Sequence, residues 1–323
     1  MQMKRDGRIM QGGIGAVGAV DEPQWYQEDF WDDISGKKLN PELIHIARAE
    51  ELEEFRKHNV YVKVPIEECI KVTNKRPIGV RWVDVNKGDE DNPEYRSRLV
   101  AKEIKRDKRD DNFAATPPLE AKKILFSLAV TEGVGYNKGL KNKGMKIDFI
   151  DVRRAYFQAM ARRDIYVDLP SEDSAPGMSG KLVKAMYGTR DAAAAWESTY
   201  SKTLMDMGFR RGRSPPCLFW HPTRHLRTLV HGDDFTVVGT EVDLKWLAEE
   251  MKSWFELKVR AILGPGDEDD KEVVIFNRIA RWTPIGIEYE ADPRHRRAIM
   301  EHFGLDKNSR VSGKGDKEEK EEE

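Results

Sequence analysis

Three aspartates are the residues of this sequence best suited to chemistry, and they occur at two places far apart in the chain. Asp151 ends an apolar run, and Asp233 and Asp234 follow Gly232 inside a second apolar stretch. Carboxylate oxygens are ligands that Mg²⁺ prefers, typically one or two of them with substrate phosphates and water. Two such ions about 4 Å apart can activate a hydroxyl group and hold a phosphate leaving group. If the fold brings the two places together, the sequence predicts metal-dependent phosphoryl transfer.

Each piece of this pattern has a simpler interpretation when taken alone. An Asp-Asp pair beside a glycine is usually part of an ordinary turn. Asp151 by itself could be a solvated strand end, and Asp148, three residues earlier, is an equally plausible carboxylate by composition. Whether the aspartates act together therefore depends on the elements that carry them.

The elements around the aspartates can be predicted from hydrophobic spacing. A strand over 146–151 places Asp151 at its end, and a helical turn follows. Two short apolar strands over 229–238 enclose a Gly-Asp-Asp turn, which is a good β-hairpin signal. A largely helical segment, 187–207, lies between these two elements in the sequence.

Further helices and strands surround this region without a strict βαβ rhythm, so the predicted class is α+β. A helix should begin after Asn40, an N-cap residue type followed by Pro41 at the first helical position, and the last helix should begin in the same way after Asp292. The other predicted elements are strands over 77–85 and 95–100 around a loop at 86–94, a helix over 119–132, an amphipathic helix over 242–255 with Leu244, Leu247, Met251, Trp254 and Phe255 on one face, and strands over 272–280 and 286–290.

The bulk composition limits the class of protein. The chain has 323 residues, of which 39% are hydrophobic and 35% charged, as in globular proteins of one large or two smaller domains. No apolar run reaches the roughly 18 residues that span a bilayer, and the N-terminus lacks the apolar core of a secretory signal. We therefore expect no membrane association and an intracellular location. Cys69 and Cys217 cannot form a CxxC site and are interpreted as buried thiols.

Charge and low-complexity segments define the ends of the folded region. The formal net charge of −2 is unlike that of strongly basic nucleic-acid-binding domains. The last ten residues, however, hold six acids and three lysines, so overall charge does not discriminate. The glycine-rich segment 1–22 and the acidic tail 309–323 cannot bury a core and are predicted to be disordered. The folded domain is expected over 23–308.

Several motifs occur along this folded region in a fixed order. DVRRAYF begins at Asp151, YGTRDAAAAW at Tyr187 and LVHGDDFTVVG at Leu229. Together they resemble the D-V-x-x-A-[FY], Y-G-L-K-Q-x-P-x-x-W and Y-x-D-D motifs of the reverse transcriptase of copia-type long-terminal-repeat retrotransposons, the RNA-dependent DNA polymerase domain of a Pol polyprotein. The stretches at 79–103, 165–170, 207–209 and 286–305 also fall in family order, so the resemblance spans roughly residues 25–305.

This resemblance implies a right-hand polymerase fold. Fingers are expected at about 40–132, a palm of antiparallel sheet backed by helices at about 146–290, and the start of a thumb or connection at 291–308, with the thumb short or missing. The implied activity is nucleotidyl transfer from a dNTP to a primer 3′-hydroxyl on an RNA or DNA template. Two Mg²⁺ ions, or Mn²⁺ in their place, are the implied cofactors.

The resemblance also implies partners and a location. The template-primer and dNTPs would be the substrates, and other parts of the retrotransposon polyprotein, such as integrase and ribonuclease H, would be partners. The location would be cytoplasmic, in a virus-like particle, or nuclear.

The same resemblance implies roles for residues near the aspartates. Asp151, Asp233 and Asp234 would be catalytic and would ligate the metals, with the carbonyl of Val152 completing one coordination sphere. Tyr156 falls where the family has an aromatic gate that excludes a ribose 2′-hydroxyl. By spacing alone, Tyr156 is equally well interpreted as a core aromatic.

Basic side chains upstream are interpreted as contacts to nucleotide and template. Arg98 is the best candidate for the triphosphate, because a planar guanidinium binds phosphate oxygens bidentately. Arg96 and Lys87 lie in the same predicted hairpin. Acidic residues interleave with the next basic stretch, so a solvated charged face is the alternative to a template contact there. The template-contacting candidates in that stretch are Lys102, Lys105 and Arg106.

Two places depart from the family pattern. Asp191 replaces the family's glutamine at the nascent base pair and would repel phosphates unless Arg190 compensates. His231 and Gly232 replace the first two residues of Y-x-D-D, where the primer is expected. These changes leave open a catalytically inactive remnant with at most nucleic-acid binding. A nuclease built on the same carboxylates is disfavoured, because the other histidines show no metal-ligand spacing.

Overall fold

The structure is a computed structural model that describes residues 29–104, 114–136, 144–275, 277–291 and 293–305. These residues form two compact units. The first unit holds the described residues as far as Glu54 together with Trp82–Leu99, and the second holds Phe55–Arg81 and the described residues from Val100 onward. The ends predicted to be disordered, 1–22 and 309–323, lie outside the described residues.

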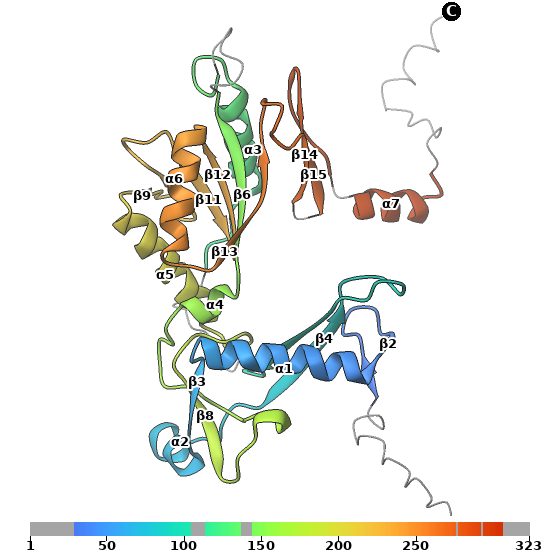
Figure 1. Cartoon of the computed structure of the whole chain (residues 1–323), viewed down its shortest axis with the longest axis vertical. Helices are drawn as coiled ribbons and strands as arrows, with labels where there is room; N and C mark the ends of the chain where they lie inside the picture. The colour runs from blue at the N-terminus through green and yellow to red at the C-terminus, as the bar shows by residue number, and fades with distance from the viewer. Residues whose placement is uncertain (1–28, 105–113, 137–143, 276, 292, 306–323) are drawn as a thin grey trace, which may run out of the picture. The chain divides into compact units, whose positions relative to one another are not determined.

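Helices and antiparallel strand pairs are mixed throughout the described residues, which agrees with the predicted α+β class (Figure 1). Among the helices that the structure describes, none is both long enough and apolar enough to cross a membrane. Both cysteines, Cys69 and Cys217, are buried free thiols, as predicted.

The first unit combines most of α1 (Pro41–Lys57) with short strands. The Asn40 side chain accepts the backbone N–H groups of Glu42 and Leu43 at 2.9 and 3.3 Å, so the predicted N-cap is confirmed. A small core forms around Phe30 and Ile44. The strands are β1 (Phe30–Trp31) paired with β2 (Lys38–Leu39), and β4 (Val80–Asn86) paired with β5 (Tyr95–Ala101), which confirms the predicted upstream strand pair.

The largest sheet lies in the second unit and has six strands in the order β13-β6-β12-β11-β10-β9. Alternate residues of its strands face two different cores. Ile150 and Phe235 pack with α5 (Ala192–Asp206) and α6 (Glu241–Lys252), and Phe149 packs with α3 (Leu119–Val130) on the other face (Figure 1). The strands are β6 (Lys146–Val152), β9 (Arg210–Arg211), β10 (Leu218–Trp220), β11 (Arg227–His231), β12 (Asp234–Gly239) and β13 (Leu257–Leu263).

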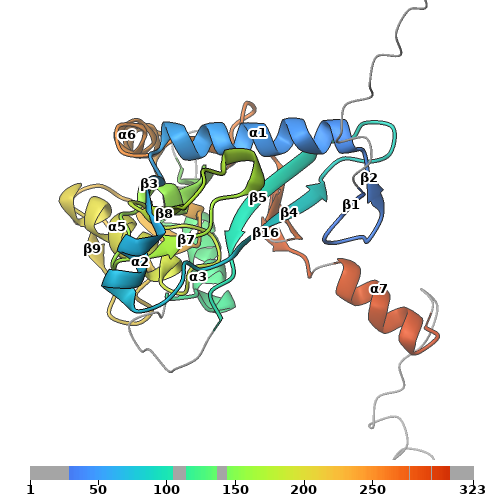
Figure 2. The ribbon, with the colours of Figure 1, turned by 90° about the horizontal axis from the view of Figure 1, so that it is seen from below.

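Two three-stranded sheets complete the second unit. One has the order β3-β8-β7 and lies beside α2 (Ile66–Thr73) (Figure 2), and the other has the order β14-β15-β16. The remaining elements are β3 (Tyr61–Pro65), α4 (Ala155–Gln158), β7 (Tyr166–Val167), η3 (Ser171–Asp173), β8 (Met178–Leu182), β14 (Glu272–Ile275), β15 (Arg278–Thr283), β16 (Gly286–Tyr289) and α7 (Pro293–His302). The expected cap of α7, Asp292, lies outside the described residues.

The helix predicted over 187–207 begins later than expected, at Ala192. Gly188 has φ +82°, which no α-helical residue adopts, and a Cβ at this position would lie 2.0 Å from the carbonyl oxygen of Ala101. The N–H of Ala101 also donates to the carbonyl of Tyr187 at 2.8 Å. The tertiary contact with the end of β5 therefore fixes a turn where local propensity alone favours helix.

Two other element predictions were wrong in part. The strand predicted over 272–280 is two antiparallel strands that reverse at Asn277, whose φ is +60°. The helix predicted over 242–255 ends at Lys252, so Trp254 leaves the apolar face and is 53% exposed, whereas Phe255 is buried. Strand β13 was not predicted, although the alternation of Leu257, Val259 and Ala261 is a strand signal.

Candidate functional site

Asp151 and Asp234 face each other across the central strands of the large sheet. The antiparallel register of β6 and β12 pairs these two residues directly. Directly opposed residues of an antiparallel pair project to the same face, with Cβ atoms about 5 Å apart. Asp233 lies in the turn before β12, and its carbonyl accepts the N–H of Val152 at 2.9 Å. The fold thus gathers the three predicted aspartates and Val152 at one end of the sheet.

A two-residue turn, Gly232 and Asp233, joins β11 to β12. Gly232 has φ +64°, so glycine is favoured at this first central position of the hairpin turn. Its carbonyl accepts the indole N–H of Trp196 at 2.7 Å, and Trp196 is buried in the core on α5. The predicted hairpin is confirmed, and α5 anchors the turn that carries the carboxylates.

A guanidinium that the sequence did not single out lies between two of these carboxylates. Nitrogens of Arg260 are 3.1 Å from Oδ1 of Asp151 and 3.3 Å from Oδ1 of Asp234. Arg260 belongs to β13, which pairs with β6 on the side away from β12. The two acidic side chains are each about one-fifth exposed, so they are reachable from solvent.

The charged groups around Asp234 shift its protonation equilibrium. Burial raises the pKa of Asp234 to about 6; Asp233 and Asp151 also raise it, while Arg260 and Lys122 lower it. Lys122 is buried on α3, and this burial lowers its pKa to about 8 although Asp234 acts in the opposite direction. The site therefore concentrates negative charge in a partly dehydrated place, which favours the binding of a cation.

Lys122 also affects the histidine that precedes the turn. Burial lowers the pKa of His231, Lys122 lowers it further, and Asp233 opposes them. A neutral His231 is therefore favoured at neutral pH. Like Arg260, Lys122 was missed by the sequence analysis, because helix periodicity alone does not reveal which face of α3 meets the hairpin.

The donor set fits divalent metal ions. Three carboxylates supply only oxygen ligands, which suits Mg²⁺ or Mn²⁺. The Arg260 guanidinium contacts Asp151 through one nitrogen and Asp234 through another, so both carboxylates face the same cationic group. Asp151, Asp233 and Asp234, with the adjoining Val152, remain the residues that would hold the metals.

Asp148, the alternative carboxylate on the same strand, lies on the opposite face of the sheet. Odd separations along a strand place side chains on different faces, so Asp148 points away from Asp151. It is 3% exposed, and its Oδ1 has no hydrogen-bond partner among the described residues. Burial raises its pKa to about 7, with Lys146 lowering and Asp269 raising it. The structure thereby distinguishes two aspartates that composition could not.

Asp191 is compensated by a residue other than the one expected. The Arg163 guanidinium contacts both Asp191 carboxylate oxygens at 3.2 Å and Glu103 at 2.6 and 2.8 Å. Glu103 also accepts the backbone N–H of Arg190 at 2.9 Å. Asp191 is buried, so its charge is balanced within the protein rather than presented openly to a phosphate.

Tyr156 lies on α4, half-buried against the core of the second unit. Its ring centroid is 4.8 Å from that of Tyr187, the first residue of the YGTRDAAAAW motif. The position is compatible with both interpretations made from the sequence, the gate and the core aromatic.

The predicted basic contacts are distributed over both units. Arg96 and Arg98 lie on β5, and Lys87 is exposed in the loop after β4; all three belong to the first unit. Lys102 is exposed in the second unit, and its N–H donates to the carbonyl of Gly79 at 2.8 Å. Two further template-contacting candidates, Lys105 and Arg106, lie outside the described residues.

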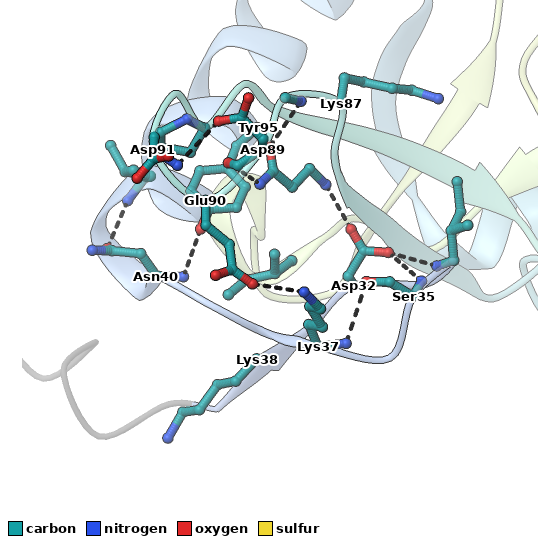
Figure 3. Close-up of a pocket in the computed structure, with 16 residues that line it drawn as sticks. Asp32, Ser35, Lys37, Lys38, Asn40, Lys87, Asp89, Glu90, Asp91 and Tyr95 are labelled. Carbon is teal, nitrogen blue, oxygen red and sulfur yellow. Dashed lines mark hydrogen bonds and ion pairs between the residues drawn. The ribbon is translucent and has the colours of Figure 1, made fainter.

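The first unit also contains an open cavity of about 960 Å³, beside the loop that carries Lys87 (Figure 3). Its polar side chains are largely engaged with the protein itself. Lys37 contacts Glu90 at 2.6 Å, and Asp32 accepts backbone N–H groups of the two turns that border the cavity. Burial opposes these hydrogen bonds, which nonetheless lower the pKa of Asp32 to about 2. The polar lining therefore stabilises the loop.

Comparisons with known proteins show which proteins this chain is similar to. The family model described as "Reverse transcriptase (RNA-dependent DNA polymerase)" matches residues 67–264. The "Retrovirus-related Pol polyprotein from transposon RE1" of Arabidopsis thaliana is 27% identical over 175 residues, which cover 52% of this chain and 11% of that protein. The corresponding polyprotein from transposon RE2 of the same plant is 26% identical over 190 residues, covering 56% and 12%. This chain therefore spans only a small part of these relatives.

The match covers more than half of the chain and includes β6, the hairpin and β13, the elements that carry the aspartates and Arg260. The matched range also contains the motifs from DVRRAYF to LVHGDDFTVVG. The chain therefore belongs to the reverse transcriptase family, as a copia-type reverse transcriptase domain of the kind found in retrotransposon Pol polyproteins.

Proposed function

We propose that this chain is an RNA-directed DNA polymerase that extends a primer on an RNA or DNA template and uses Asp151, Asp233 and Asp234 to bind two divalent metal ions. The observation that carries the proposal is the pairing of Asp151 with Asp234 across β6 and β12, next to the turn that holds Asp233. Family membership supports the reaction class, and the oxygen-only donor set supports Mg²⁺ or Mn²⁺.

In the proposed reaction, the primer 3′-hydroxyl attacks the α-phosphate of a dNTP, a new P–O bond forms, and pyrophosphate leaves. When bound, the metals would supply activation of the hydroxyl and stabilisation of charge on the phosphoryl group. Asp151 and Asp234 would hold the metals from two strands, and Asp233 would add a carboxylate from the turn. Trp196 keeps the turn in place through its hydrogen bond to Gly232.

The roles of the other residues belong to the same proposal. Tyr156 is proposed to exclude a ribose 2′-hydroxyl, and the Asp191 position to adjoin the nascent base pair together with Arg190. Around the turn, His231 and Gly232 adjoin the primer. The basic residues proposed to contact the triphosphate or the template backbone are Arg98, Arg96, Lys87, Lys102, Lys105 and Arg106.

A right-hand arrangement of fingers and palm is part of this proposal, with the six-stranded sheet as the palm. An antiparallel sheet backed by α3 on one face and by α5 and α6 on the other supports the palm assignment. The fingers at about 40–132 and a thumb or connection starting at 291–308 remain proposals.

An inactive remnant is the competing function. Asp191 and His231 favoured it, because both depart from the family pattern. The ion pair of Asp191 with Arg163 weakens this argument, since the additional acid is balanced inside the fold. The His231 pKa is lowered by burial and by Lys122, so the added ring is favoured in its neutral form and need not compete with metal for the carboxylates.

The test is primer extension on an RNA template with dNTPs and Mg²⁺, comparing the wild-type chain with Asp151→Asn and Asp148→Asn. The two variants make the same chemical change on opposite faces of one strand. We expect extension by the wild type and by Asp148→Asn, and a loss of at least about 100-fold in Asp151→Asn, in the range for removing one group that stabilises transition-state charge. Absence of extension by the folded wild type with both Mg²⁺ and Mn²⁺ would favour the inactive remnant.

A further inference from the structure

Arg260 is placed as a cation between the carboxylates of two different strands. Its Nη2 contacts Asp151 at 3.1 Å and its Nη1 contacts Asp234 at 3.3 Å, so each arm of the guanidinium serves one carboxylate. The Arg260 side chain is 49% exposed, so the guanidinium can leave toward solvent without unpacking the core. Two carboxylates directly opposite each other repel, and the guanidinium offsets that repulsion.

A break in strand pairing gives Arg260 this position. Lys258 pairs with Asp151 and Val259 with Ile150, but Ala261 then pairs with Phe149, so Arg260 is the extra residue of a β-bulge. Bulges redirect a side chain and recur beside active sites. Val259 packs in the core shared with α5 and α6, and Ala261 packs in the core shared with α3. The bulge therefore lets β13 pack against both cores while Arg260 contacts the two carboxylates.

Arg260 is also bordered by the hairpin that follows β13. A cavity of about 10 Å³, large enough for a single water at most, is lined by Asp234, Arg260 and the β14 residues from Val273 to Ile275. The neighbouring strand β14 therefore packs beside the Asp234 and Arg260 pair.

We propose that Arg260 is a positioning residue of the metal centre. In the metal-free chain it keeps Asp151 and Asp234 together by standing in the place of a cation, and metal binding displaces its guanidinium toward solvent. The inference rests on the proposed function, because it takes these aspartates as metal ligands. It adds that the Arg260 guanidinium competes with the metal for the two carboxylates. Arg260 therefore raises the metal concentration at which the site is half occupied.

The test measures Mn²⁺ binding to the full chain directly. Electron paramagnetic resonance detects the free Mn²⁺, and neither nucleic acid nor dNTP is present. We compare the wild type with Arg260→Gln and, as the matched control, Arg210→Gln, which makes the same change at an exposed position on β9, at the opposite edge of the sheet from β13. We expect Arg260→Gln to bind Mn²⁺ about five- to tenfold more tightly, within the range for releasing its two partly exposed ion pairs. Arg210→Gln should change the affinity less than about twofold.

Thermal unfolding separates this role from a purely structural one. Without metal, Arg260→Gln should melt at a lower temperature than the wild type, because the carboxylates lose their counter-charge, and saturating Mg²⁺ should raise its melting temperature more than that of the wild type. An Arg260 that only stabilises the fold would lower the melting temperature equally with and without Mg²⁺, and this result would overturn the inference.

The outcomes also separate this inference from the proposed function. Mn²⁺ binding of equal strength in the wild type and Arg260→Gln, and abolished in Asp151→Asn, would overturn the role of Arg260 while leaving the metal centre intact. An equal gain in affinity from Arg210→Gln would overturn it as well, because the effect would then be general charge removal. No binding to either the wild type or Arg260→Gln would overturn both the metal centre and the role of Arg260.

Discussion

Asp148 and Asp151 project to opposite faces of the sheet because they are three residues apart on β6. Asp151 lies on the face that carries the candidate metal centre, and Asp148 is buried on the other face with Oδ1 lacking a partner among the described residues. A buried carboxyl without full hydrogen bonding is costly when ionised, which is why the pKa of Asp148 is raised to about 7. Burial, which composition does not reveal, therefore distinguishes the candidate ligand Asp151 from Asp148, which destabilises the fold when it is ionised.

Replacing Asp148 by Asn should stabilise the chain at alkaline pH. The folded-state pKa lies above the ordinary value of 3.8, so ionisation of Asp148 destabilises the native state fully above pH 7 and progressively less as the pH falls toward 4. We expect Asp148→Asn to raise the free energy of unfolding by roughly 2 to 4 kcal/mol at pH 8. Urea denaturation of both chains between pH 4 and 8 measures this. A gain that is the same at every pH would contradict the explanation.

Helix α5 connects the core of the second unit to the turn that carries the carboxylates. Trp196 is buried against Tyr200 and Phe255, at centroid distances of 5.5 and 5.1 Å, and its indole N–H reaches the carbonyl of Gly232. Since Gly232 has a positive φ, the turn depends on both the glycine and this external hydrogen bond. Helix α5 therefore holds the turn, and the carboxylates that the turn carries, against the packed core.

Replacing Trp196 by Phe should weaken this connection. The change removes the donor to Gly232 but keeps an aromatic ring. Gly232 lies in an exposed turn, so we expect a loss of about 0.5 to 1.5 kcal/mol in the free energy of unfolding, the net range for one hydrogen bond. Primer extension should fall as well, because the turn positions Asp233. Trp220→Phe is the control, since Trp220 lies on β10 away from the turn and is 38% exposed. Equal effects of the two substitutions would argue against the anchoring role.

Ion pairs between distant segments hold the second unit together. Glu103 follows β5, Arg163 follows α4, and Asp191 precedes α5, yet one guanidinium joins all three. The two acidic side chains are 12% and 8% exposed, so their charges depend on Arg163. Across the fold of the second unit, Asp191, which departs from the family motif, therefore forms a structural ion pair.

Replacing Arg163 by Met should therefore destabilise the chain strongly. Two buried carboxylates would lose their counter-charge, and breaking such a pair costs about 3 to 5 kcal/mol. Arg162→Met is the matched control, because Arg162 is its exposed neighbour in sequence. Adding Asp191→Gln, which restores the family's glutamine, should recover part of the loss. Chemical denaturation of the four chains measures these differences, and absence of recovery would show that Asp191 does not depend on Arg163.

Local sequence signals specify the elements that carry the site. The alternation of apolar residues and the Gly-Asp-Asp turn specified β6, β11 and β12, and the order of motifs specified the reverse transcriptase family. Asn40 and Pro41 specified the start of α1. These features follow from interactions between residues near in sequence, so they can be predicted without knowing the rest of the fold.

The charged side chains that meet at the site are brought together by long-range packing. The β-bulge that aims Arg260 at Asp151, the face of α3 that brings Lys122 to Asp234, and the pairing of Arg163 with Asp191 join residues far apart in the chain. A shift of one residue in strand register would send a side chain to the opposite face, and no local signal fixes that register. The sequence therefore supplied the carboxylates, and the packing of strands and helices supplied the cations that control them.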